Sequence, residues 1–292
     1  MKTRLFYNYS YYLPGVRGMF ALFMMFILGA VLGNIVALPL AALLPAESAT
    51  DWITLITYPI MFLPPMLYAR SKSKTSSVFH NGLAVDSANF GRLGGVKMAL
   101  IVSGMTIATA FAAEPISSLL PEMPEWFEQI MSGLTGGNFI LSFICVSIFA
   151  PIFEEWLCRG VVLRGLLTTM RPASAIAVSA AFFAVLHMNP WQALPAFLLG
   201  VVFGYVYYKT GSLKLTMLMH FVNNTMALVM SRIPSLQDAE TFADVMSPWA
   251  YACVIAACII FLAAAFITLR AIPMSSENAP CNCDEVPSIS FE

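Results

Sequence analysis

Residues 139–171 read FILSFICVSIFAPIFEEWLCRGVVLRGLLTTMR, an apolar run interrupted by two adjacent glutamates, Glu154 and Glu155, and by Arg159. A helix that crosses the hydrocarbon core of a bilayer needs about 20 mostly apolar residues, and this run is long enough. Ionisable side chains inside a span are costly, so they mark a functional site by default. The run is therefore predicted to be a span from Phe139 to Leu157, extending to about Met170, that carries chemistry.

The composition of the whole chain also points to a membrane. The chain has 292 residues, of which 59% are hydrophobic and only 11% are charged. A soluble domain carries roughly 25% charged residues, so most of this surface is expected to face lipid. The net charge is −1 and there is no basic block, which argues against binding to nucleic acid.

The same length criterion predicts eight spans along the chain. They are Met19–Leu44, Ile53–Tyr68, Val96–Ala113, Phe139–Leu157, Pro172–His187, Trp191–Tyr208, Leu215–Met230 and Pro248–Leu269. The segment Leu120–Met131 mixes glutamates with aromatic and aliphatic residues, as an interfacial helix does. The expected fold class is therefore all-α, a polytopic membrane helical bundle of about eight transmembrane helices.

The distribution of charge predicts the orientation of these spans. With the N-terminus in the cytoplasm, every lysine and arginine except Arg232 falls on the cytoplasmic side, and the outer loops carry mainly acids. The positive-inside rule describes this asymmetry, so both termini are expected to be cytoplasmic. The retained first span, the short loops and the charge bias suit an integral protein of a bacterial plasma membrane, with the lipid bilayer as its surroundings.

Further polar residues lie in the spans that follow the glutamates. His187 ends the next span, and His220 and Asn224 lie within the seventh. Glu154 and His187 are almost equally far in sequence from the turn at Arg171–Pro172, roughly 25 Å along their helices, so they are expected at similar depth. His220 is counted from the next cytoplasmic turn and reaches only part of that depth, so a tilt or a break must make up the difference.

Helical spacing suggests partners for these side chains. Glu155 and Arg159 are four residues apart and share a helix face, whereas Glu154 points about 100° away. Glu154 is then without a cationic partner and suited to act as a general base, with His187 sharing its proton or holding a water molecule. Each residue also has a simpler interpretation, since Glu155–Arg159 could be a structural ion pair and His220 an ordinary core residue.

His220 and Asn224 are also four residues apart, and both can offer N–H donors to a developing oxyanion. Three motifs now stand in order on separate spans: Glu154-Glu155-x-x-x-Arg159, Phe183-x-x-x-His187 and His220-x-x-x-Asn224. In these motifs the sequence resembles the CPBP family of CAAX proteases and bacteriocin-processing enzymes, whose pattern is EExxxR, FxxxH and HxxxN or HxxxB. The resemblance covers roughly Phe139 to Met230.

The resemblance implies peptide-bond hydrolysis inside the membrane. It implies that Glu154 and His187 activate water and that His220 and Asn224 form the oxyanion hole, and it gives Glu155 and Arg159 a supporting role. The regions expected are a cytoplasmic N-terminus (1–18), N-terminal membrane spans with an interfacial helix (19–136), a catalytic CPBP-like core (137–232), an outer loop with the last span (233–272) and a disordered cytoplasmic tail (273–292).

Metal dependence stays open at this point. The family is often described as metalloproteases, but the chain has no HExxH, the usual zinc helix. A zinc ion would have Glu154, His187 and His220 as its three protein ligands, with water in the fourth position. We favour a reaction without a metal or another cofactor.

The expected function is an intramembrane endopeptidase. Its partner would be a membrane protein or peptide, membrane-associated or CAAX-like, cleaved by water that glutamate and histidine activate. Two alternatives remain. Carboxylates and histidines also serve proton-coupled transporters and ion-binding membrane proteins, although the polar residues lie in one half of the chain and no internal repeat is visible. The other alternative is a non-proteolytic member of the family that acts as an immunity factor or scaffold.

Overall fold

The structure, a computed structural model, is helical throughout the part of the chain that it describes. It describes all residues except 1–4, 79–81, 234–235, 237–240 and 273–292. No strand occurs in the described residues, which confirms the predicted all-α class. The predicted disordered tail lies outside the described residues.

The helices follow one another with short connections. A 3₁₀ turn, η1 (Tyr7–Tyr9), precedes the first long helix. The helices are α1 (Val16–Leu43), α2 (Ala46–Ser76), α3 (Gly94–Ser117), α4 (Glu125–Gly136), α5 (Phe139–Ser142), η2 (Phe143–Phe149), α6 (Ala150–Glu155), η3 (Trp156–Leu163), α7 (Arg164–Leu166), α8 (Pro172–Leu186), α9 (Pro190–Thr210), α10 (Leu213–Met230), α12 (Phe242–Val245) and α13 (Pro248–Arg270). The elements from α5 to α7 form one unbroken helix, Phe139–Leu166, which we call the glutamate helix.

Among the described residues, six helices are long and apolar enough to cross a membrane. They are α1, α2, α3, the glutamate helix, α9 and α13. They indicate a multi-pass integral membrane protein. The other two predicted spans coincide with helices α8, of 15 residues, and α10, of 18 residues, which fall outside this group. The count of eight spans and the cytoplasmic placement of both termini stay predictions.

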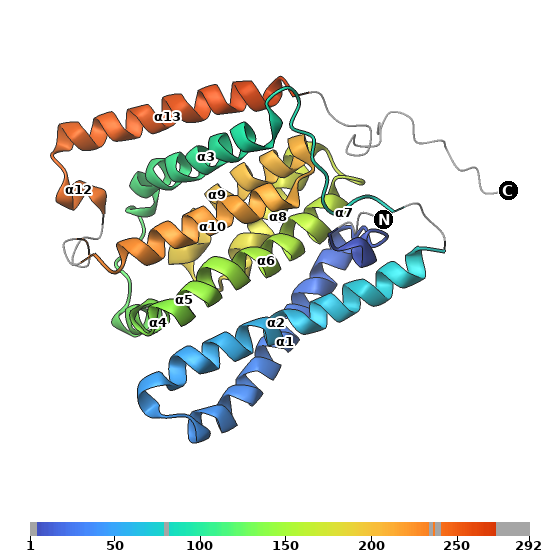
Figure 1. The fold of residues 1–292 in the computed structure, drawn as a ribbon, viewed down its shortest axis with the longest axis horizontal. Helices are drawn as coiled ribbons and strands as arrows, with labels where there is room; N and C mark the ends of the chain where they lie inside the picture. Colours follow the sequence, from blue (N-terminus) through green and yellow to red (C-terminus); the bar gives the residue numbers. More distant parts are fainter. Residues whose placement is uncertain (1–4, 79–81, 234–235, 237–240, 273–292) are drawn as a thin grey trace.

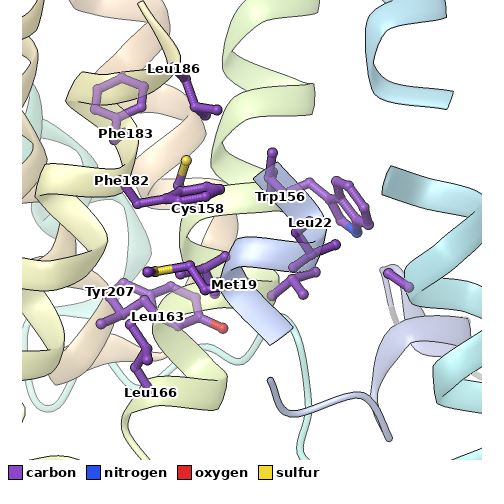
Figure 2. Packing of buried hydrophobic residues seen from close by; sticks show 14 of the residues in the cluster. Met19, Leu22, Trp156, Cys158, Leu163, Leu166, Phe182, Phe183, Leu186 and Tyr207 are labelled. Carbon is purple, nitrogen blue, oxygen red and sulfur yellow. The ribbon is translucent and has the colours of Figure 1, made fainter. Parts of the chain in front are cut away.

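The arrangement of the helices puts the glutamate helix between two groups. On one side, the α1–α2 hairpin packs against it, and on the other side α10 packs against it, followed by α3 and the outermost helix α13 (Figure 1). The hairpin contributes directly to the buried core. Met19 and Leu22 of α1 lie beside Trp156 and Leu163 of the glutamate helix (Figure 2). The hairpin and the glutamate helix therefore share one core.

The outward faces of the helices remain apolar. On α13, Ile259, Ile260 and Ile267 are 54%, 70% and 71% exposed. Such a row of large apolar side chains is unfavourable in water but suits the hydrocarbon core of a bilayer, where helices present apolar faces to lipid. The exposed surface therefore agrees with a membrane environment.

The helix predicted at Leu120–Met131 is present, but it begins later. Helix α4 runs over Glu125–Gly136, with Pro124 as its N-cap. A proline disfavours the helical conformation of the residue before it, so Pro121 and Pro124 keep this segment out of the helix. The amphipathic pattern located the helix, and the prolines set its start.

Candidate active site

The glutamate helix is distorted on both sides of its two carboxylates. The stretches η2 and η3, which precede and follow α6, are π-helical. Pro151 has no backbone N–H to donate, which disturbs the regular ladder near the end of η2. Ala150 N–H bonds to Cys145 O, five residues back, in place of Val146 O. Single wide turns of this kind are frequent at functional sites because they change the direction of side chains.

Asn224 donates a hydrogen bond to the backbone carbonyl that this wide turn leaves without a helical partner. Its Nδ2 donates to Val146 O over 2.9 Å, and its Oδ1 accepts from Asn223 Nδ2 over 3.1 Å. A buried backbone carbonyl without a partner is unfavourable, so this contact fixes α10 against the distorted turn. Asn224 therefore lies beside the glutamate helix with one of its two amide hydrogens already engaged.

Glu155 links an arginine and a histidine from two helices. Its Oε1 accepts from Arg159 Nη1 over 2.7 Å and from His220 Nδ1 over 3.0 Å. The side chains of Glu155 and Arg159 are fully buried and that of His220 is 5% exposed. The pair expected from four-residue spacing is thus present. The bond to Glu155 places the proton of His220 on Nδ1, so Nε2 points to the other side of the ring.

The Arg159 guanidinium contacts a backbone carbonyl and two aromatic rings in addition to Glu155. Its Nη2 donates to Gly200 O of α9 over 3.1 Å, and its centre lies 4.6 Å and 5.4 Å from the ring centres of Phe183 and Phe203. Aromatic faces attract a cation, and the attraction grows when water is excluded. A Cβ added at Gly200 would lie 3.3 Å from Nη2, so the glycine makes room for the guanidinium.

Glu154 points away from this ion pair, as the helical spacing predicts. Its Oε1 accepts a hydrogen bond from the hydroxyl of Tyr58 on α2. Its Oε2 is buried without a hydrogen-bond partner and lies 3.9 Å from His220 Nε2. A buried carboxylate oxygen without a donor is costly. Oε2 of Glu155 is also buried without a partner, but of the two glutamates Glu154 is the one that lines the cavity described below, where a water molecule can reach it.

His187 lies at the C-terminal end of α8 with one nitrogen fixed. Its Nδ1 lies 3.0 Å from Phe183 O. A carbonyl oxygen only accepts hydrogen bonds, so Nδ1 carries the proton and the lone pair of a neutral ring lies on Nε2. The loop after the helix supports this position, because Asn189 Nδ2 donates to His187 O over 2.7 Å. His187 is thereby oriented with a free basic nitrogen.

A cavity of about 120 Å³ brings Glu154 and His187 to one space. Its remaining lining is apolar except for the tyrosine hydroxyl and comes from α1, α2 and α8: Phe26, Tyr58, Met61, Phe62 and Leu186. This volume holds a few water molecules or one side chain. The two residues expected at similar depth therefore line the same small, mostly apolar cavity.

The predicted depth of His220 was too shallow. The structure brings it level with both glutamates, because the α9–α10 turn from which the depth was counted lies inside the bundle. Thr210 and Ser212 of that turn are buried, and the segment before α3 covers it through bonds from Ser87 N–H to Gly211 O and from Asn89 N–H to Thr210 O. No tilt or break in α10 is needed.

The side chains named for a zinc ion do not fit one as they are placed. In the part of the chain that the structure describes, no group of three His, Cys, Asp or Glu side chains is arranged to hold a metal ion. One nitrogen of His220, Nδ1, is already bonded to Glu155. The chemistry below is therefore derived from the chain's own groups.

Two residues of the site were missed in the sequence. Tyr58 comes from a helix almost a hundred residues before Glu154, and only its position in an apolar span next to Pro59 sets it apart. Gly200 gives no signal at all, because its part is to supply a carbonyl and space. A local motif search does not find such residues, since their contacts depend on tertiary packing.

The comparisons with known proteins agree with this arrangement. Residues 136–226 match the family model described as type II CAAX prenyl endopeptidase Rce1-like. No curated protein and no solved structure matches the chain. The matched segment contains all seven residues named in the three motifs, whereas Tyr58 lies outside it. Residues 136–226 are therefore a domain of the Rce1-like type II CAAX prenyl endopeptidase family.

Proposed function

We propose that the protein is an intramembrane endopeptidase that uses Glu154 and His187 to activate water. The observation that carries this proposal is the unpartnered Oε2 of Glu154, buried at a cavity that His187 also lines. A water molecule placed there would satisfy the carboxylate oxygen and could donate its second proton to Nε2 of His187. Such a water is held by two bases, which is the geometry that general-base hydrolysis requires.

The reaction would proceed in two steps. Glu154 takes a proton from the water while the oxygen attacks the carbonyl carbon of the scissile peptide bond, forming a tetrahedral intermediate. Glu154 then passes that proton to the leaving nitrogen as the C–N bond breaks, which yields a new carboxyl group and a new amine. The carboxylate returns to its starting state, so no group is consumed.

The negative oxygen of the intermediate needs hydrogen-bond donors. We assign this part to His220 and Asn224, whose helix faces the distorted turn beside Glu154. The nitrogen of His220 that would face the oxyanion is Nε2, because Nδ1 is already bonded to Glu155. Donors arranged in advance for an oxyanion are worth several kcal/mol in hydrolases.

Glu155 and Arg159 are assigned a supporting part. Arg159 forms an ion pair with Glu155, and Glu155 in turn fixes the ring orientation of His220. Neither side chain lines the cavity, and both are fully buried. Their part is therefore to orient the donor and to keep the charges of the site balanced.

The substrate is proposed to be a membrane-associated protein or peptide, including CAAX-like sequences, in keeping with the family of the matched segment. Eight spans with both termini in the cytoplasm remain the proposed topology, and a bacterial plasma membrane the proposed location. The apolar lining of the cavity supports an apolar residue next to the scissile bond.

The test is cleavage by the purified protein in liposomes, using a library of membrane-spanning peptides together with prenylated peptides that end in CAAX. Glu154→Gln should lower kcat by about 10²–10⁴-fold, because the amide keeps the shape but cannot accept the proton. Glu125→Gln, on an exposed position of α4, is the matched control and should cleave like the wild type. A wild type that cleaves no peptide, or a Glu154→Gln variant with undiminished cleavage, contradicts the proposal.

A further inference from the structure

The base of the proposed reaction is held by a residue from outside the matched domain. Tyr58 lies on α2, lines the cavity and donates its hydroxyl hydrogen to Oε1 of Glu154. A carboxylate has two equivalent oxygens and rotates easily about its terminal bond. A donor on one oxygen removes that freedom and determines which oxygen faces the cavity.

The hairpin packing explains why Tyr58 reaches Glu154. Gly29 of α1 lies so close to α2 that a Cβ there would be 2.0 Å from Met61 O. Next to this contact, Phe62 of α2 has its ring centre 5.6 Å from that of Tyr58 and stacks on Phe153 at 5.3 Å. Phe153 directly precedes Glu154, so the aromatic contact fixes α2 against the glutamate helix at this level.

We infer that Tyr58 is a positioning residue for Glu154, holding Oε1 so that only Oε2 receives the catalytic water. This inference rests on the proposed function. It extends the site beyond residues 136–226, because the α1–α2 hairpin then supplies part of the machinery as well as the apolar wall of the cavity. Tyr58 itself transfers no proton, since its hydroxyl keeps its hydrogen throughout.

Other ionisable groups also surround Glu154. His220 approaches from α10 and His187 from α8, while Glu155 lies on its own helix. The thiols of Cys145 and Cys158 are near enough to feel its charge. Tyr58, unlike the groups just named, has a direct hydrogen bond to Glu154. Removing its hydroxyl therefore isolates one contact and leaves the charges unchanged.

The kinetic experiment uses the full-length protein in liposomes. Tyr58→Phe should lower kcat by about 10- to 100-fold with little change in KM, because a misplaced base slows the reaction without changing substrate contacts. Tyr68→Phe, the same change ten residues along α2, should leave both quantities as in the wild type.

A second measurement does not depend on proteolysis. Thermal unfolding of Tyr58→Phe, Glu154→Gln and the double variant forms a double-mutant cycle, which detects direct contact as a departure from additivity. We expect coupling between these two positions and none between Tyr68→Phe and Glu154→Gln. Coupling with a protein that cleaves nothing would support the contact while rejecting the proposed function. Additive effects, or a Tyr58→Phe variant with unchanged kcat, overturn the inference.

Discussion

The matched segment, residues 136–226, and the α1–α2 hairpin differ in how much of their surface is buried and in which polar groups they contribute to the site. In the most apolar stretch of the glutamate helix 44% of residues are buried, against 22% in α1 and 17% in α2. The matched segment encloses the Glu155–Arg159 ion pair completely, with both side chains at 0% exposure. The hairpin shows most of its surface to the surroundings and directs one hydroxyl, that of Tyr58, at the site.

We therefore assign the reacting groups to the matched segment and the positioning of Glu154 to the hairpin. The charged groups that can move protons and stabilise an oxyanion come from the matched segment, whose buried ion pair requires close packing around it. The hairpin closes the cavity and orients Glu154 without adding charge. Changes in the two regions should therefore fail differently, the first through loss of the fold and of activity together, the second mainly through activity.

The largest effect is expected from Arg159→Met. This change leaves Glu155 buried without its cation and His220 without a fixed partner, which should cost about 3–5 kcal/mol of unfolding free energy and abolish cleavage. Unfolding in detergent, followed by denaturant titration, measures the loss. Arg171→Met is the control, because Arg171 is exposed. Equal stability of the two variants would show that the enclosed ion pair does not hold the domain together.

Arg164 connects the matched segment to the residues that precede α1, and the second prediction concerns this contact. Its guanidinium donates to five backbone carbonyls: Gly160 on its own helix, Leu83, and Tyr9, Ser10 and Tyr12 ahead of α1. Arg164→Met removes this donor from all five carbonyls, of which Tyr9 O and Ser10 O keep a backbone N–H donor, and should cost about 3 kcal/mol. Hydrogen exchange should then become faster at the backbone amides that precede α1.

Arg92→Met serves as the control for Arg164, since Arg92 is exposed. Unchanged exchange in the segment before α1 would mean that the hairpin is held to the matched segment by its apolar contacts alone. The comparison of the two regions would then rest on the core around Met19 and Leu22.

A smaller effect on stability, but a clear one on activity, is expected from Gly29→Ala. The new Cβ would lie 2.0 Å from Met61 O, so α2 must shift, and Tyr58 with it. Overpacking of this kind costs about 1–3 kcal/mol, and a displacement near 1 Å can reduce kcat by about 10²-fold. One turn further along, Gly33→Ala meets its nearest atoms at 3.6 Å and should behave like the wild type. If both variants keep full kcat, the hairpin does not position the base.

The sequence was sufficient for the contacts that depend on local spacing. Four-residue separation predicted the Glu155–Arg159 pair, and the turn at Arg171–Pro172 predicted that Glu154 and His187 lie at similar depth, in agreement with the cavity that both residues line. The roles assigned to these residues stay predictions. Pro151 inside an apolar span was a signal for the wide turn that Asn224 completes, because proline leaves a helix without one donor.

Contacts that depend on tertiary packing could not be predicted in this way. The depth of His220 was wrong because the turn before α10 is covered by another segment, which no count along one helix reveals. The contact of Tyr58 with Glu154 depends on Gly29, which lets α1 and α2 approach closely. The number of spans also does not follow from helix length alone, because α8 has only 15 residues and yet packs against α9 and the glutamate helix.

The smallest effect is expected from a strong chelator. The two regions together supply a base, a proton acceptor and donors, while Glu154, His187 and His220 are not arranged to hold an ion. Prolonged chelation followed by dialysis should therefore leave kcat unchanged, whereas a zinc endopeptidase treated in the same detergent should lose activity. A loss that added zinc restores would show that these three side chains rearrange around a metal, and that Oε2 of Glu154 is a ligand of the ion before it is a base.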